Sequence, residues 1–222
     1  MDLSSIVIVG GGAGGLELAC KLGRKLGPDR VTLVDAKMYH IWKPSLHEVA
    51  AGTLDIHQEG LSYPMLAHNN GFNFVLGAME GLNGRDRQVE IAAVRDDVGD
   101  EVLPRRVLQF GTLVISVGSQ SNYFGVKGAQ DFTISLDGPQ QAESFRLKML
   151  KHLATLDLRK KLDPSASLDI VIIGAGATGV ELAAELREAS HVHSRYGFSR
   201  IDAARDVTIT ILEGAPSILP VL

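Results

Sequence analysis

The stretch Ile6-Val7-Ile8-Val9-Gly10-Gly11-Gly12-Ala13-Gly14-Gly15-Leu16-Glu17-Leu18-Ala19 decides the fold. Its β-branched start predicts a buried parallel strand, which breaks into glycines and continues as a helix with an apolar period. Gly10, Gly12 and Gly15 fit the spacing G-x-G-x-x-G. In that spacing the first glycine permits a tight turn, the second lets a pyrophosphate approach the backbone, and the third lets helix and strand pack closely. The N-terminal end of the helix would then face the phosphates.

An acidic residue follows at the distance that this motif requires. Val31-Thr32-Leu33-Val34-Asp35 predicts the second strand, which ends in a carboxylate. Asp35 follows Gly15 at the spacing of about 20 residues at which the motif places the acid that accepts hydrogen bonds from a ribose; surface capping is the alternative role. A glycine pattern alone is weak evidence, because any tight turn between strand and helix can produce it. The ordered set of strand, turn, helix, strand and acid predicts dinucleotide binding.

Composition sets the class of protein. The chain has 222 residues, is 45% hydrophobic and 22% charged, and carries a net charge of −4. These values are typical of a globular protein, and the lack of a basic stripe argues against nucleic-acid binding. We expect no signal peptide and no membrane span. The single cysteine, Cys20, indicates a reducing cytoplasm. His40 and His47 lack partners at metal-binding spacing, so no metal site is expected.

Further strands and helices are expected along the chain. A short helix should run from Pro44 through Ala50, before Gly52 stops it; beside it, Trp42 either packs or shields a bound ring. A helix from Pro139 to about Thr155, capped by Asp137, should bury one apolar face, and the charged stretch Asp157–Ser167 should form a junction. A third parallel strand is expected at Asn73–Gly77, and another buried strand at Leu113–Gly118. Between them, a small antiparallel excursion is expected at Gln88–Ile91 with Val102–Phe110.

The opening motif then returns. Gly174, Gly176 and Gly179 repeat the glycine spacing after the apolar run Ile170–Ile173. Val207–Glu213 supplies the second strand and its terminal acid. This acid lies farther past Gly179 than the usual spacing of about 20 residues, and the additional residues fall in a longer helix and loop. Two complete βαβ fingerprints predict two dinucleotides and transfer between them.

At these residues the chain resembles the two-dinucleotide flavoprotein oxidoreductases, and within them most closely the type II NADH dehydrogenases. The stretches that carry the resemblance are Tyr39–Gly52, Leu113–Gly125 with Leu136–Glu143, Gly174–Leu186 and Tyr196–Leu219. The resemblance implies an α/β fold of two Rossmann-like units with a small antiparallel excursion. Residues 1–136 would form the FAD domain and residues 137–222 the start of the NAD(H) domain.

The resemblance also implies an activity. NADH would pass a hydride to FAD, and electrons would go on to a membrane quinone. The segment His40–Gly52 lacks the cysteine pair of disulfide reductases, so direct transfer without a thiol relay is expected. Two alternatives stay open, a flavoprotein that binds NADH with low turnover for signalling or assembly, and another FAD-dependent pyridine nucleotide reductase.

Site residues are carried over from the family position by position. Glu181 is the expected catalytic residue, which would help to position the nicotinamide or modulate the hydride step from the first turn of the second helix. Lys43 would either stabilise reduced flavin or be a solvated lysine. Glu213 would accept the ribose 2′-hydroxyl and favour NADH over NADPH, since a 2′-phosphate would meet like charge. The full set of expected cofactor-binding residues is Gly10, Gly12, Ala13, Gly14, Gly15, Asp35, Ala36, Lys37, Lys43, Pro44, Met79, Ser116, Val117, Gly118, Gly174, Gly176, Thr178, Gly179, Val180, Glu181 and Glu213.

Proteins of this family are much longer than this chain, and therefore the chain is expected to be a truncated, N-terminal fragment. Such a fragment should not reduce quinone and should hold FAD weakly or not at all. The complete protein would be cytoplasmic and peripheral on the inner face of the membrane, docked through C-terminal segments beyond Leu222. An unpaired sheet edge in the fragment would favour a homo-oligomer.

Overall fold

The computed structural model describes residues 4–219, which divide into two compact units. The first unit contains the chain up to Trp42 together with Gly60–Gln120, and the second contains Lys43–Glu59 and the chain from Ser121 onward. The short segment Lys43–Glu59 thus leaves the first unit and joins the second. The expected junction at Asp157–Ser167 is wrong, because this stretch lies inside the second unit.

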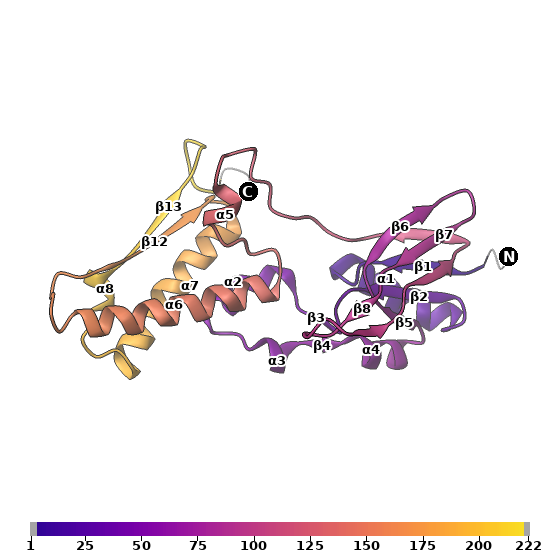
Figure 1. The fold of residues 1–222 in the computed structure, drawn as a ribbon, viewed down its shortest axis with the longest axis horizontal. Coiled ribbons are helices and arrows are strands. Elements are labelled where there is room, and N and C mark those ends of the chain that lie inside the picture. The colour runs from indigo at the N-terminus through magenta and orange to yellow at the C-terminus, as the bar shows by residue number, and fades with distance from the viewer. Residues whose placement is uncertain (1–3, 220–222) are drawn as a thin grey trace. The chain divides into compact units, whose positions relative to one another are not determined.

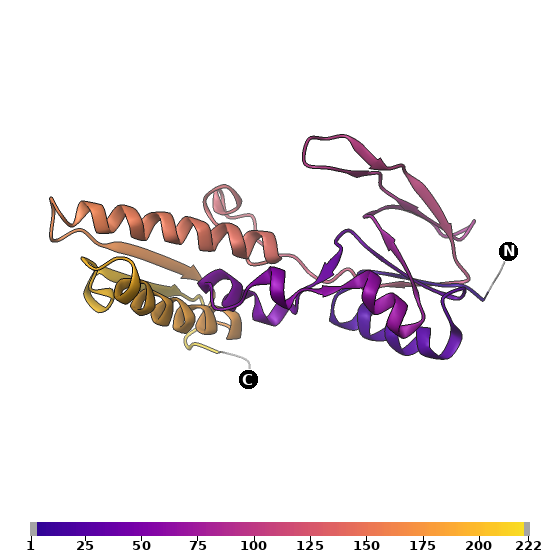
Figure 2. The ribbon, with the colours of Figure 1, turned by 90° about the horizontal axis from the view of Figure 1, so that it is seen from below.

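The first unit has three layers (Figures 1 and 2). Its central sheet is parallel, in the order β11-β1-β2-β5. The elements of this unit are β1 (Ile6–Val9), α1 (Ala13–Leu26), β2 (Val31–Asp35), β3 (Tyr39–His40), β4 (Leu61–Ser62), α4 (Tyr63–Asn70), β5 (Asn73–Leu76), β6 (Met79–Asn83), β7 (Gln88–Ile91), β8 (Val94–Arg95), β9 (Glu101–Leu103), β10 (Arg106–Gln109) and β11 (Thr112–Ile115).

Alternating side chains of the parallel strands fill two cores. Ile8 and Leu33 face α1 and α4, where they pack with Leu16 and Ala19 of α1. Residues of opposite parity, Val7, Val9 and Val34, pack against β7 of the antiparallel sheet β10-β7-β6. Both faces of the sheet are therefore covered, as continuous apolar strands require.

The second unit is built on a parallel pair, β12 and β13. Figure 1 shows the two long helices α6 and α7 on one side of this pair, and the side chains of the strands alternate between buried and exposed accordingly. Its elements are a 3-10 turn (Lys43–Ser45), α2 (Leu46–Ala51), α3 (Ile56–Glu59), α5 (Ala129–Phe132), α6 (Pro139–Arg159), β12 (Leu168–Ile173), α7 (Ala177–Tyr196), α8 (Ala203–Asp206) and β13 (Val207–Leu212). Helix α2 packs against α6 and α7.

The structure confirms the first two strands, the third parallel strand, the short helix ended by Gly52 and the strand pair of the second fingerprint. The strand expected to be buried at Leu113–Gly118 ends at Ile115 and is half exposed, because β11 lies at the edge of the sheet. Val102–Phe110 is two strands, broken around Pro104, which has no N–H to donate.

The long helix begins at Pro139 as predicted, but its cap and its C-terminal end differ from the prediction. Helix α6 runs to Arg159, and its N-cap is Gly138 without a side-chain cap. Asp137 is the expected cap, but its carboxylate accepts hydrogen bonds from the backbone N–H and hydroxyl of Ser121 instead. The apolar pattern of the sequence also predicts that Leu147 lies on the buried face of this helix, but Leu147 is exposed.

Candidate functional site

The first glycine turn has the geometry that its spacing predicts. Gly10 adopts a φ of +100°, which favours glycine, and its N–H donates to the Val34 carbonyl over 2.8 Å. A Cβ at Gly15 would overlap the Gly10 carbonyl oxygen, whereas a Cβ at Gly12 would meet no protein atom within 4 Å. Helix and strand are therefore in close contact at Gly15, and the space beside Gly12 is open to a ligand.

The acid of the first fingerprint lies against the same turn. Asp35 Oδ2 accepts a hydrogen bond from Gly11 N over 2.7 Å, and Oδ1 accepts one from Lys37 N over 2.9 Å. A carboxylate has about four acceptor positions, so these two bonds leave capacity for ribose hydroxyls. The contact with a ribose stays a prediction, as do the contacts expected of Ala36 and Lys37.

Residues after β11 border the Gly10 turn from the neighbouring strand. Ser116 N donates to the Val9 carbonyl over 2.7 Å, and a Cβ at Gly10 would overlap the Ser116 carbonyl. Val117 is exposed and Gly118 has a φ of +75°. The structure thus brings Ser116 to the first glycine turn. Met79 begins β6, and its partly buried side chain packs on the core shared with β7.

Two residues beside this turn were missed by sequence reasoning. The Gly11 carbonyl accepts hydrogen bonds from the Tyr63 hydroxyl over 2.7 Å and from His40 Nδ1 over 2.9 Å. The sequence pattern raises His40 only as a metal ligand, and it does not single out Tyr63. The one feature of the sequence that could have indicated these neighbours is Gly11, a glycine at a position where the G-x-G-x-x-G motif requires none.

The second glycine turn repeats the first. Gly174 has a φ of +102°, a Cβ at Gly179 would overlap the Gly174 carbonyl oxygen, and a Cβ at Gly176 would meet nothing within 4 Å. Glu213 Oε2 accepts from Ala175 N over 2.7 Å, and Oε1 accepts from Ala215 N over 2.8 Å. These backbone bonds, that of Ala215 first, hold the pKa of Glu213 below its usual value.

Glu181 lies in the second turn of α7, not the first as expected, because the helix begins at Ala177 and its first turn holds no acidic residue. Its carboxylate is 3.6 Å from His47 Nδ1, which also bonds to the Pro44 carbonyl over 2.8 Å. A carbonyl only accepts hydrogen bonds, and therefore Nδ1 of His47 carries the proton. His47 Nδ1 thus lies near the Glu181 carboxylate while it donates to the carbonyl of Pro44, which follows Lys43 in the 3-10 turn.

One turn further along the same helix, the Thr53 hydroxyl donates to Glu185 Oε2 over 3.2 Å. Because Glu181 and Glu185 are four positions apart on α7, their side chains share a face of the helix. The segment that contains α2 therefore contacts α7 at two successive turns. Thr178 and Val180 lie on α7 just before Glu181.

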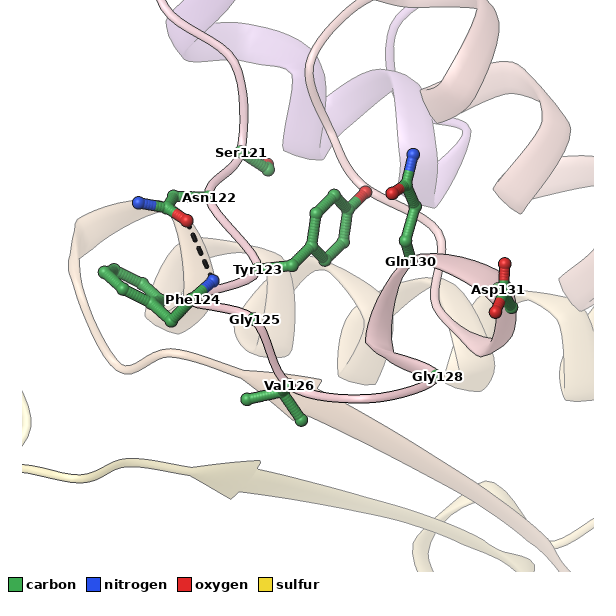
Figure 3. Close-up of a pocket in the computed structure, with 9 residues that line it drawn as sticks. All are labelled: Ser121, Asn122, Tyr123, Phe124, Gly125, Val126, Gly128, Gln130 and Asp131. Carbon is green, nitrogen blue, oxygen red and sulfur yellow. Dashed lines mark hydrogen bonds between the residues drawn. The ribbon is translucent and has the colours of Figure 1, made fainter.

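One hollow of the second unit lies apart from both glycine turns. A hollow of about 530 Å³ is lined by residues between Ser121 and Asp131, none of which belongs to either turn. Figure 3 shows the Phe124 ring projecting away from Tyr123, with the Asn122 side chain accepting from Phe124 N over 2.8 Å. Within residues 4–219, no cluster of His, Cys, Asp or Glu could hold a metal ion, and no helix is long and apolar enough to cross a membrane.

Two glycine turns of this geometry, each followed by a strand that ends in an acid, define the class of α/β proteins with paired dinucleotide-binding units. The family model for pyridine nucleotide-disulphide oxidoreductases matches residues 4–222. The chain belongs to that family.

Relatives and solved structures agree with this assignment. The chain is 39% identical to a type II NADH:quinone oxidoreductase of Haemophilus influenzae, over 99% of this chain and 53% of the relative. It is 30% identical to a protein of the same name from Staphylococcus saprophyticus, over 99% of this chain and 51% of the relative. The chain spans about half the length of these relatives. A solved structure of NDH2 from Plasmodium falciparum in complex with NADH has the same fold, with a TM-score of 0.79 at 24% identity, over 98% of this chain and 43% of that one.

Proposed function

We propose that the first glycine turn binds FAD, that the second binds NADH, and that the chain forms this part of an NADH:quinone oxidoreductase. The observation that carries the proposal is the repeated turn, in which the first and third glycines are constrained while Gly12 and Gly176 face open space. The names of the curated relatives support the choice of NADH and quinone.

The residues present fit two dinucleotides. Helices α1 and α7 have no acidic residue in their first turns, so nothing there opposes a pyrophosphate at their positive ends. The carboxylates of Asp35 and Glu213 are each held by two backbone N–H groups and keep free acceptor positions for ribose hydroxyls.

A bound flavin would supply the redox chemistry, accepting a hydride from NADH and passing electrons to the quinone. The chain's own residues would bind the flavin and NADH and orient them. His47 donates to the Pro44 carbonyl and lies 3.6 Å from the carboxylate of Glu181. We propose that Glu181 contacts the nicotinamide. The Lys43–Gly52 segment contains no cysteine, which favours direct transfer over a thiol relay.

We further propose that the complete protein is cytoplasmic and works at the inner face of a membrane, and that this chain by itself forms homo-oligomers. One face of the β12–β13 pair supports self-association. Val171, Ile173 and Leu212 are each more than half exposed there, and exposed apolar patches of this kind favour a covering partner.

A flavin and NADH titration tests the proposal. A protein that carries this chain at the full length of its relatives should bind added FAD, and NADH should bleach the visible flavin absorbance under anaerobic conditions. The reduced protein should then be reoxidised by a soluble quinone. Bleaching without fast reoxidation by quinone would favour the low-turnover alternative, and a failure to bind FAD would contradict the proposal.

A further inference from the structure

The peptide groups on both sides of Gly11 are fixed by side chains. On one side the Gly11 N–H donates to Asp35, and on the other the Gly11 carbonyl accepts from Tyr63 and from His40. His40 is 8% exposed and Tyr63 is 3% exposed, so water does not compete for these bonds. A buried hydrogen bond of this kind strongly restricts the orientation of its peptide.

Local topology explains how two residues far apart in sequence reach one carbonyl. The pair β3–β4 places His40 opposite Leu61, two positions before Tyr63. Tyr63 N also donates to the Met38 carbonyl over 3.0 Å, and the Tyr63 ring stacks on Phe74 with centroids 5.2 Å apart. A Cβ at Gly11 would come within 2.5 Å of this ring. Glycine at this position is thus required by Tyr63.

The second fingerprint holds the equivalent carbonyl in another way. Ala175, which corresponds to Gly11, donates its N–H to Glu213 in the same manner, but its carbonyl accepts from the backbone N–H of Leu219 over 2.8 Å. In both turns the carbonyl is fixed, by side chains in the first and by main chain in the second. Side-chain substitutions can therefore release this carbonyl only in the first turn.

We propose that Tyr63 and His40 are positioning residues that set the affinity of the first turn for the pyrophosphate of its dinucleotide. In a trans peptide the C=O of Gly11 and the N–H of Gly12 point in opposite directions. Holding the carbonyl toward Tyr63 and His40 consequently aims the Gly12 N–H away from them. The inference rests on the proposed function, since it takes FAD as the ligand of this turn.

Both donors keep their protons. The Gly11 carbonyl is an acceptor only, and therefore His40 Nδ1 carries the hydrogen. Burial, and to a smaller extent the carboxylate of Asp35, raises the pKa of Tyr63. The phenol thus stays a donor at neutral pH.

Ligand titrations of matched variants, made in a protein that carries this chain at the full length of its relatives, test the proposal. Tyr63→Phe removes only the hydroxyl, and His40→Leu removes the second donor. Each should weaken the binding of FAD, and of ADP as a flavin-free pyrophosphate probe, by about fivefold, from the loss of one buried hydrogen bond. The double variant should lose more affinity for FAD and for ADP than the product of the two single losses. Only the double variant leaves the Gly11 carbonyl without a side-chain donor.

Controls separate positioning from general destabilisation. Tyr39→Phe, at an exposed neighbour in the same strand, should leave FAD binding unchanged, and His40→Asn should restore part of the loss by offering a donor near Nδ1. NADH affinity measures the second turn in the same molecules and should not change. Unchanged FAD and ADP affinity in the double variant would overturn this inference alone. Equal losses for FAD and NADH would also overturn it, while a wild-type protein of the relatives' full length that binds no FAD would overturn the proposed function as well.

Discussion

The two glycine turns share their ligand-facing geometry but differ in what surrounds them. In both, the first glycine has a positive φ near +100°, the second faces open space and the third touches the first. Yet a Cβ at Gly10 would overlap the carbonyl of Ser116, which follows the neighbouring strand β11, whereas a Cβ at Gly174 would meet nothing within 4 Å. The shared features belong to the motif itself, and the differences come from a sheet of four strands in one unit and of two in the other.

The largest loss of stability is expected from substitution of the third glycine, whose close contact is the same in both turns. Gly15→Ala and Gly179→Ala each drive a methyl group into a backbone carbonyl that cannot move without breaking the turn. Each should lower the free energy of unfolding of its own unit by roughly 3 kcal/mol or more. Urea unfolding followed by circular dichroism measures the loss. A loss in only one of the two variants would break the proposed equivalence of the turns.

A smaller loss of stability is expected from substitution of the first glycine, whose surroundings differ between the two turns. Gly10→Ala and Gly174→Ala both place alanine at a positive φ, which costs about 1–2 kcal/mol. Gly10→Ala also overlaps Ser116, so it should be the more destabilising of the two by about 1 kcal/mol or more. The same urea experiment compares them. Equal losses would mean that the neighbouring strand does not constrain the first turn.

Cofactor selectivity should depend on the acid of the second turn only. Glu213→Gln should reduce the preference for NADH over NADPH by about tenfold, since the negative charge that opposes a 2′-phosphate is removed. Dissociation constants for both cofactors provide the ratio. Asp35→Asn is the matched control in the first turn and should leave the ratio unchanged. An unaltered ratio in Glu213→Gln would show that another residue selects the cofactor.

The smallest expected effect is a pH dependence of the second unit. The pKa of Glu213 is lowered in the folded chain by backbone N–H groups, from an unfolded value of 4.5. Its contribution to stability is therefore fully present above about pH 4.5 and is lost as the pH falls through the lower folded pKa. Thermal melts of wild type and Glu213→Gln should converge as the pH is lowered below the unfolded pKa. A constant difference between them across this range would contradict the bonding of Glu213.

How far the sequence predicts this molecule can be seen residue by residue. Motif spacing is a local property, and it correctly located Gly10, Gly15, Gly174 and Gly179 in close strand–helix turns. Tyr63 escaped because it reaches Gly11 through the β3–β4 pairing, which no periodicity in the sequence marks.

Long-range packing also explains the other differences. The exit of Lys43–Glu59 from the first unit depends on helix α2 packing against α6 and α7, far away in sequence. Asp137 looks like a helix cap by local rules, but Ser121 supplies donors that the sequence pattern does not reveal. Strand β11 is likewise exposed because it lies at the edge of its sheet, and the order of the strands cannot be read from the sequence of one strand.

Crossed substitution of the two open glycines tests the central claim most directly. Gly12→Val and Gly176→Val add side chains to spaces in which a Cβ meets no protein atom, so both variants should fold. In a protein that carries this chain at the full length of its relatives, isothermal titration of each variant with FAD and with NADH should show that Gly12→Val loses FAD and keeps NADH, and that Gly176→Val does the reverse. Undiminished FAD binding in Gly12→Val, or the loss of both ligands in either folded variant, would contradict the assignment of one dinucleotide to each turn.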